Sequence, residues 1–263
     1  FCFYHPFPNP IIQKKCRDII KGVHPRAVIS ISSDVAPEFR EYFRASTTVI
    51  NAGIQPVVEK YLSKIESKLN EIGFKGESLI MQSNGGVLTF KAAKFKPVFM
   101  VESGPAAGVI ASTYIGNNLG FNNIMSFDMG GTTAKTGLIE KGTPRITKEY
   151  EVGTAARAEY GAKGSGYPIR TPVIDLIEIG AGGGSIAKVN DLGLLKIGPE
   201  SAGADPGPAC YGLGGTEATV TDALLLLGFL DTNFFLGGKM KLNRLASEKA
   251  IEKKSCNAAI LKV

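Results

Sequence analysis

The chain has 263 residues, 44% of them hydrophobic and 21% charged, which is the composition of a globular protein and excludes intrinsic disorder. Its net charge of +6 would suit a nucleic-acid partner, but the Lys and Arg residues are spread along the chain, Trp is absent and no basic run alternates with aromatic residues, so we predict no such partner. No segment approaches the ~18 uninterrupted apolar residues of a membrane span, so we expect no membrane contact.

The chain opens on a short strand-like run without an initiator Met or a signal peptide, and we interpret it as an internal part of a longer protein. Residues 1–121 are predicted to alternate helix and strand, because apolar residues recur at helical spacing between short β-branched runs. Pro56 lies inside the longest helical pattern and should kink or divide it. The expected elements are a helix from Pro10 to Val23, a strand over 27–32, a helix from Ser46 to Ile72, a strand over 79–82 and a helix from Pro105 to about Leu119.

Residues 122–231 are predicted to form a glycine-hinged antiparallel meander that ends in a short buried helix. Thr221 and Asp222 should cap this helix, whose residues 223–227 are almost all apolar. Residues 232–263 are Lys-rich and lose their hydrophobic period, so we expect a peripheral helix or a severed connection there. The strands of the meander are expected over 124–128, 133–139, 145–152 and 173–179.

The strongest functional signal is an acid at a strand end followed by two glycines and two threonines: Asp128, Gly130, Gly131, Thr132 and Thr133. The glycines allow a tight turn whose N–H groups, together with the Thr hydroxyls, can cradle phosphate oxygens. The acid can hold Mg²⁺ through water. The alternative is a plain hairpin whose turn begins with Asp, and the local pattern alone does not decide between the two.

A second glycine-rich turn follows the strand over 173–179 and has the sequence GAGGGS. Consecutive glycines suit positive φ or a close approach of backbone to a ligand, so Gly182, Gly183 and Gly184 are candidates for a nucleotide-facing turn. A dinucleotide-binding fold is disfavoured, because the GxGxxG spacing and a following βαβ unit are missing. The alternative is a wide glycine corner that packs against another strand.

Other candidate side chains carry weaker signals. Asp205 is held in place by two prolines, and its carboxylate is expected to satisfy its own turn rather than to take part in chemistry. Cys210 is a weak nucleophile candidate because no His lies near it in sequence. The four cysteines and two histidines have no metal-ligand spacing and indicate reduced thiols in a cytoplasmic protein. Asp175 and Glu178 lie three apart on one predicted strand, hence on opposite faces.

These segments together resemble the second portion of the hydantoinase A/5-oxoprolinase family, which includes subunits of ATP-dependent acetone and acetophenone carboxylases. The resemblance covers about residues 3–231 in order. It implies an α/β fold of the actin-like ATPase (ribonuclease H-like) type, with one partial lobe over 1–121 and one fuller lobe over 122–231. The matching segments are SSDVAPEFREYFRASTTVINA (32–52), MQSNGG (81–86), ESGPAAG (102–108), FDMGGTTAK (127–135), IGAGGGSIA (179–187) and GPESAGADPGPACYGLGGTEATVTDA (198–223).

The resemblance also implies ligands, partners and residue roles. ATP would phosphorylate a substrate oxygen, so that a cyclic amide such as hydantoin or 5-oxoproline is opened or a ketone is carboxylated. A second subunit of the hydantoinase B type is implied as a partner. The segments over 83–86 and 103–108 resemble the adenosine and hinge segments of actin-like proteins. Asp128 would serve the phosphate and Mg²⁺ side, Gly130, Gly131, Thr132 and Thr133 would form the phosphate cradle, and Gly182, Gly183 and Gly184 would form a second nucleotide-facing turn.

Two positions depart from the family pattern. Lys135 stands where relatives usually have Asp, and Ile177 stands where many have His, so a carboxylate that could help to hold metal is missing. The other acid-Gly-Gly-Thr segment of the family is absent from this chain, and we expect the isolated chain to fold without catalysing. A small-molecule kinase of the same fold and a non-catalytic assembly module stay open as alternatives, and Lys135 favours the second.

Overall fold

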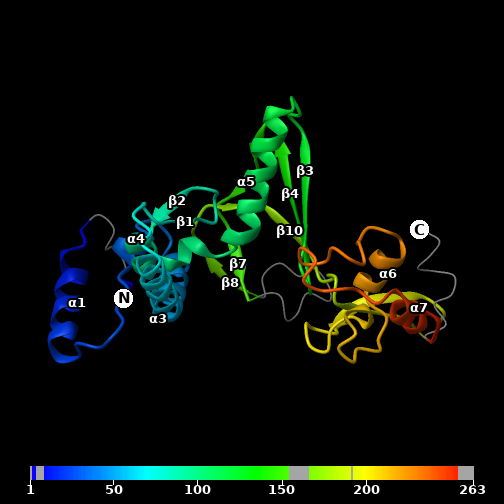
Figure 1. Ribbon diagram of the computed structural model, residues 1–263. Coiled ribbons are helices and arrows are strands. Elements are labelled where there is room, and N and C mark those ends of the chain that lie inside the picture. The colour runs from blue at the N-terminus through cyan, green and yellow to red at the C-terminus, as the bar shows by residue number, and fades with distance from the viewer. Residues whose placement is uncertain (1, 4–8, 154–165, 191, 254–263) are drawn as a thin grey trace. The chain divides into compact units, whose positions relative to one another are not determined.

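Figure 1 shows the computed structural model, which describes residues 2–3, 9–153, 166–190 and 192–253. The chain divides into two compact units, Phe1–Ser126 with Gly137–Leu176 (unit 1) and Phe127–Thr136 with Ile177–Val263 (unit 2). Helices and strands occur in both units, which confirms the predicted α/β class. None of the helices within the described ranges combines the length and the apolar character that a membrane crossing requires.

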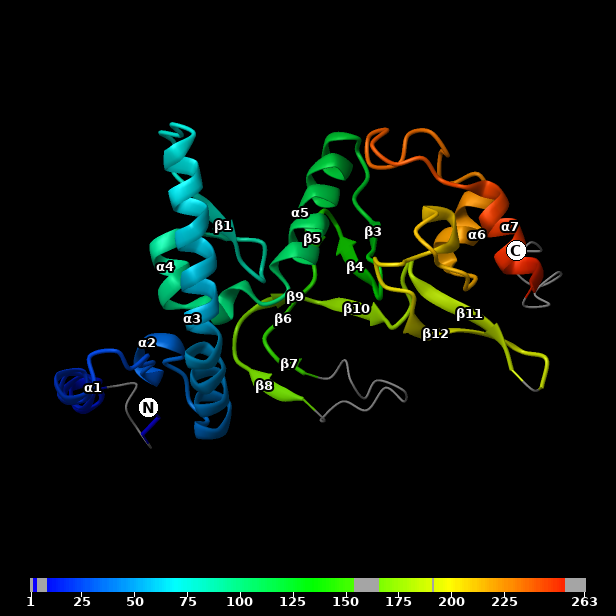
Figure 2. The same cartoon turned by 60° about the horizontal axis from the view of Figure 1, so that its bottom comes forward.

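The first part of unit 1 is helical, with α1 over Ile11–Val23, α2 over Ser32–Val35 and α3 over Glu41–Glu71. The helix α1 begins one residue after the predicted start, because Pro10 is its N-cap and Ile11 its first residue. The helix α3 starts earlier than expected from Ser46 and continues past Pro56, so the predicted division of this helix is wrong (Figure 2). Proline removes one backbone hydrogen bond, and the neighbouring elements that pack along α3 hold the helix together around it.

The strand predicted over 27–32 does not form, and the segment leads into a helix that Gln13 contacts. Gln13 is fully buried, its Nε2 donates to Ser32 Oγ (2.9 Å) and its Oε1 accepts from Ser33 N (3.0 Å). The N–H of Ser33 is thus paired with a side chain of α1, and the short helix α2 begins at Ser32. Ser32, the last residue of the predicted strand, therefore belongs to a helix instead.

The middle of unit 1 packs around α3. The strands β1 (Leu79–Met81) and β2 (Val87–Thr89) pair antiparallel, and α4 (Phe90–Phe95) and the 3₁₀ helix η1 (Pro97–Met100) follow. The strand predicted over 79–82 is thus confirmed. Leu62 of α3 is buried with Phe90 and Ala93 of α4. Asn51 joins the same elements through polar contacts, because its Nδ2 donates to Phe95 O (3.2 Å) and its Oδ1 accepts from Val98 N (3.2 Å).

A sheet with the strand order β10-β4-β3, in which β5 also pairs with β4, follows the helix α5. Its elements are α5 (Ser103–Asn118), β3 (Ile124–Met129), β4 (Ala134–Glu140), β5 (Thr143–Pro144) and β10 (Leu176–Ile179). Ile139 and Ile174 pack on Ala106 and Val109 of α5. This packing assigns residues 137–176 to unit 1, whereas the sequence suggests a boundary at residue 121 and places 122–231 in one lobe.

Two long strands expected from the sequence are each broken in two. Residues 145–152 form β6 (Ile146–Thr147) and β7 (Tyr150–Val152), and residues 173–179 form β9 (Val173–Ile174) and β10. The short pieces have different partners, since β6 pairs with β9 and β7 pairs with β8 (Tyr167–Ile169). The break at Asp175 coincides with a bond from its N–H to Arg145 O (2.8 Å).

Unit 2 holds the antiparallel pair β11 (Ser185–Val189) and β12 (Leu195–Ser201), the 3₁₀ helix η3 (Ala209–Tyr211), α6 (Val220–Leu226) and α7 (Arg244–Lys253). The cap of α6 is Thr219, two residues before the predicted cap Thr221, and Asp222 completes a capping box with it. The helix expected beyond residue 231 forms as α7, but it is not peripheral. Ala250 and Ile251 are buried in one cluster with Ala187, Ala209 and Ala218.

Candidate functional site

The candidate site begins at the first glycine turn, residues 130–133, which joins β3 to β4. The Gly130 N–H donates to Thr133 O (2.9 Å) and closes the turn. Within the described part of the chain, the N–H groups of Gly131 and Thr132 and the Thr132 hydroxyl make no hydrogen bond, and both residues are exposed. The turn thus presents a small group of unused donors, which is the arrangement that binds an anion.

The second glycine turn, residues 180–184, packs directly on the first. Gly183 N donates to Gly130 O (2.9 Å) and Gly184 N donates to Gly131 O (2.7 Å). A Cβ at Gly182 would lie 2.6 Å from both Gly130 O and Thr132 N, closer than real Cβ contacts come. Gly182 is therefore required because two backbones touch there.

Positive φ is not the reason for these glycines, in contrast to one of the sequence expectations. Gly130, Gly131 and Gly182 to Gly184 all lie outside the left-handed region. A Cβ at Gly183 would meet Thr221 Oγ1 at 2.8 Å, so a larger side chain there strikes the protein rather than a ligand first. The glycine corner that packs on a neighbouring element, weighed above as the alternative, describes the second turn well.

The second turn is also hydrogen-bonded to two further elements. The N–H and the hydroxyl of Thr221, in the first turn of α6, both donate to Gly183 O (2.8 Å each). Ala202 N, just after β12, donates to Gly184 O (2.8 Å). Ser185 Oγ accepts from Gly182 N (2.8 Å) and closes the turn itself. The second turn therefore acts as a rigid support for the first.

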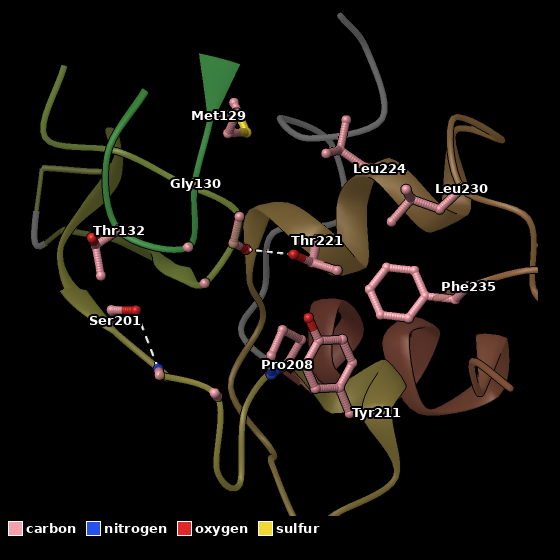
Figure 3. Close-up of a pocket in the computed structure, with 15 residues that line it drawn as sticks. Met129, Gly130, Thr132, Ser201, Pro208, Tyr211, Thr221, Leu224, Leu230 and Phe235 are labelled. Carbon is pink, nitrogen blue, oxygen red and sulfur yellow. Dashed lines mark hydrogen bonds between the residues drawn. The ribbon is translucent and has the colours of Figure 1, made fainter. Parts of the chain in front are cut away.

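A pocket of about 600 Å³ opens between these turns and the rest of unit 2 (Figure 3), within the size range of ligand sites. Gly131, Thr132, Gly183 and Gly184 line one side. Tyr211, Leu224, Leu230 and Phe235 line the opposite side, with Thr221 between the two (Figure 3). Every lining side chain is uncharged, so an anion bound here would be held by backbone and hydroxyl donors of the lining.

Asp128 lies next to this pocket in sequence but does not line it. It alternates along β3 with Met129, which does line the pocket, and successive side chains of a strand point to opposite faces. The Asp128 carboxylate is exposed and has no hydrogen-bond partner among the described residues. Thr133 and Gly182 also lie outside the lining, whereas Gly130, Gly131, Thr132, Gly183 and Gly184 are brought together.

Few side chains near the pocket could bind a metal ion. The described residues contain no group of three or more His, Cys, Asp and Glu side chains that could hold a metal ion. A single carboxylate such as Asp128 still matches Mg²⁺, which proteins often bind through one or two carboxylates together with waters and substrate phosphates. Asp128 can therefore serve Mg²⁺ only when a phosphate ligand supplies further oxygens.

The charged residues singled out from the sequence are mostly paired. Lys135 Nζ lies 3.9 Å from Glu178 Oε2, with only 16% of the Lys135 side chain exposed. Arg145 Nε lies 3.8 Å from Asp175 Oδ2. Asp205, which precedes a cis proline, is exposed and makes no hydrogen bond to a described residue, so the expectation that it satisfies its own turn is wrong.

Sequence reasoning missed a buried carboxylate network behind the pocket. Asp222 is fully buried and accepts hydrogen bonds from Cys210 N (2.8 Å), Thr219 Oγ1 (2.7 Å) and Ser247 Oγ (2.7 Å). It thereby joins α6, α7 and η3, of which α6 and η3 supply pocket residues. The signal in the sequence was the Thr219-x-x-Asp222 spacing of a capping box.

Cys210 belongs to the same network and is unsuited to nucleophilic catalysis. Burial, with a further contribution from the charge of Asp222, raises the pKa of its thiol from 9.0 to about 12. Since the thiolate is the nucleophile, a thiol that stays protonated at neutral pH is inert. Cys210 therefore has a structural role, and the weak nucleophile candidate from the sequence is not supported.

The comparisons with known proteins identify the relatives of this chain. Residues 44–261 match the sequence model described as Hydantoinase/oxoprolinase. The chain belongs to the hydantoinase/oxoprolinase family. This confirms the family recognised from the sequence motifs.

Three members of the hydantoinase/oxoprolinase family illustrate the relationship. An uncharacterized protein of Methanocaldococcus jannaschii is 48% identical over 95% of this chain and 37% of its own length. Caprolactamase subunit alpha of Pseudomonas jessenii is 37% identical over 94% of this chain and 34% of its own length. The crystal structure of ATP-dependent caprolactamase from that organism matches with a TM-score of 0.72 at 35% identity, over 96% of this chain and 35% of that chain.

The third member is acetone carboxylase, whose nucleotide-free structure, solved in work on ATP-dependent acetone carboxylation, matches with a TM-score of 0.72. The identity is 30%, over 96% of this chain and 34% of that chain. The chain therefore spans about a third of the length of these hydantoinase/oxoprolinase relatives.

Proposed function

We propose that this chain supplies the phosphate-binding half of the ATP site in an enzyme that hydrolyses a cyclic amide. The observation that carries the proposal is the first glycine turn, where the Gly131 and Thr132 N–H groups and the Thr132 hydroxyl have no partner among the described residues. Backbone donors of this kind form concavities that bind phosphate oxygens. ATP is supported by the relatives named as ATP-dependent enzymes.

The support of the first turn by the second gives it the preorganisation that phosphate binding needs. Bonds from Gly183 N and Gly184 N fix the carbonyl groups of Gly130 and Gly131 on the far side. The N–H groups of the first turn therefore keep their direction without a ligand, which lowers the ordering cost of binding. Asp128 would hold Mg²⁺ with the phosphates, and the metal would neutralise part of their charge.

The proposed chemistry follows from activation of a poor electrophile. Transfer of the γ-phosphoryl group to the amide oxygen breaks the bond to ADP and makes the amide carbon electrophilic. One water then adds to that carbon, the ring C–N bond breaks, and a second water releases phosphate. In this reaction the chain orients the phosphates, and the actin-like second half of the site and a second, hydantoinase B-type subunit would come from outside the chain.

A second candidate is ATP-dependent carboxylation of a ketone, which the structural match to acetone carboxylase favours. The same activation of a carbonyl oxygen applies, so the role of the glycine turns is unchanged. Lys135, which favoured a non-catalytic module, is paired with Glu178 and lies outside the pocket lining. That pairing weakens the case for a non-catalytic module.

The test uses the intact protein, together with its partner subunit. ATP turnover is measured with 5-oxoproline, hydantoin and caprolactam, and separately with acetone and bicarbonate. The proposal expects a cyclic amide to stimulate ATP hydrolysis, with loss of most of the stimulation in Thr132→Val. Stimulation by the ketone alone would select carboxylation, and a stable phosphate ester of the substrate would select a kinase.

A further inference from the structure

The side of the pocket opposite the glycine turns is lined by apolar side chains and has no role so far. We define the aromatic wall as Tyr211 and Phe235, whose ring centroids lie 5.6 Å apart with an interplanar angle of 40°. Leu224 and Leu230 line the pocket beside this wall (Figure 3). Thr221 lies between the wall and the glycine turns, so one pocket has a donor end and an aromatic end.

The aromatic wall is built into the core of unit 2. Both rings pack on the buried cluster of Cys210, Leu225 and Leu242. The backbone next to Tyr211 is fixed by the bond from Cys210 N to Asp222 Oδ1 (2.8 Å), and Phe235 O accepts from Gly238 N (3.0 Å) in a closed loop. The wall therefore exists before a ligand arrives.

We infer that the aromatic wall and the two leucines bind the base of the nucleotide whose phosphates lie on Gly131 and Thr132. This inference rests on the proposed function, since it extends the same ligand from one end of the pocket to the other. It differs from the sequence expectation that residues 83–86 form the adenosine segment, because those residues do not line the pocket. A ligand that fits must carry an anionic group at one end and a flat, uncharged group at the other, which describes a nucleoside polyphosphate. Nucleic-acid bases stack on aromatic side chains because every base has a π-face.

Polar atoms at this end suit a heterocycle better than a saturated ring. Burial raises the pKa of the Tyr211 phenol, so its hydroxyl stays protonated and can donate to a ring nitrogen or a ribose oxygen. The Thr221 hydroxyl donates to Gly183 O and keeps its own lone pairs available beside the centre of the pocket. A lactam or ketone, being small and non-aromatic, would gain little from stacking on this wall.

The deciding experiment records NMR chemical shifts of the labelled amide groups and Leu methyl groups of the chain. Chemical shifts detect weak binding at millimolar ligand concentrations. Mg-ATP is compared with magnesium tripolyphosphate, which has the phosphates and no base. Both ligands should shift the Gly131 and Thr132 amides, and only ATP should shift the Leu224 and Leu230 methyls through ring currents.

The outcomes separate this inference from the proposed function. Amide shifts without methyl shifts under ATP would overturn the base site and leave the phosphate site standing. Equal methyl shifts with both ligands would also overturn it, because tripolyphosphate has no ring. Absence of shifts at Gly131 and Thr132 with both ligands would overturn the proposed function itself.

A pair of matched variants gives a second readout. Phe235→Leu keeps apolar volume and removes one stacking ring, so the dissociation constant for ATP should rise about fivefold or more while that for tripolyphosphate stays unchanged. Phe235→Tyr keeps an aromatic ring at this position and should bind ATP as tightly as the unchanged chain. Phe229→Leu is the control, since Phe229 is 76% exposed and lies outside the pocket lining. Equal effects of Phe235→Leu on both ligands would contradict the base site.

Discussion

Gly182 and Thr132 approach so closely that a Cβ at residue 182 would lie 2.6 Å from the Thr132 backbone nitrogen. The nitrogen belongs to the donor group of the first glycine turn, and backbone atoms cannot rotate out of the way as the end of a side chain can. The fit between the two turns is therefore set by the absence of a side chain at Gly182.

Gly182→Ala should displace the first glycine turn and weaken both folding and phosphate binding. Forced overpacking costs about 1–3 kcal/mol of stability, and the shifted donors should lower the affinity for tripolyphosphate further. Gly180→Ala is the matched control in the same turn, because a Cβ there meets nothing within 4 Å. Urea unfolding and ligand titration of both variants check the prediction, which a harmless Gly182→Ala would contradict.

Gly183→Ala should clash with Thr221 rather than with a ligand, because its Cβ would lie 2.8 Å from Thr221 Oγ1. Thr221→Ala removes that atom and also the bond to Gly183 O. We expect the double variant to be more stable than the sum of the single losses predicts, by about 0.5 kcal/mol or more. A thermodynamic cycle from urea denaturation measures this coupling, and simple additivity would show that the two positions do not interact.

Asp128→Asn should leave folding nearly unchanged and abolish most ATP turnover in the intact protein. The carboxylate is exposed and has no bonding partner in the described ranges, so its charge does little for stability. Loss of a positioned catalytic group lowers the rate by about 10²-fold or more. Asp18→Asn on α1 is the control, since among the described residues that acid is paired with Arg17 alone, at the surface. Normal steady-state turnover in a folded Asp128→Asn protein would exclude the role.

The stability of the chain should decline as the pH rises above about 9, partly because of Cys210. The pKa of this thiol is raised from 9.0 to about 12 in the folded state, so between these values the unfolded chain loses the proton and the folded chain keeps it. Proton release on unfolding favours the unfolded state as pH rises, and this contribution is fully present only below pH 9. Cys210→Ala should show a shallower decline between pH 9 and 11 in urea titrations, and parallel curves would refute the linkage.

The isolated chain should bind Mg-ATP with a millimolar dissociation constant or weaker, about 4 kcal/mol of binding free energy, and should not hydrolyse it. Phosphate contacts are strong when enclosed, and the first glycine turn is exposed on this chain. Calorimetric titration and an assay for released phosphate check this. Micromolar affinity with turnover would show that the site is complete within the chain.

The sequence by itself determined the features that depend on neighbouring residues along the chain. Pro10 leads into α1 because its fixed φ suits the helix start, and residues 130–133 turn between β3 and β4 where the glycine pattern predicts a turn. The order of such segments identified the family and the candidate phosphate turn. These features are local, so periodicity and turn chemistry were enough to find them.

Only the tertiary structure decided which distant segments meet. Gln13 of α1 bonds to Ser32 and Ser33 at the start of α2, and Phe235 joins Tyr211 to form the aromatic wall. Gly182 is required by the backbone of Thr132, which lies 50 positions earlier in the sequence. The physical reason is that steric contact, burial and hydrogen bonding between remote residues depend on how the chain folds back on itself, and no local pattern contains that information.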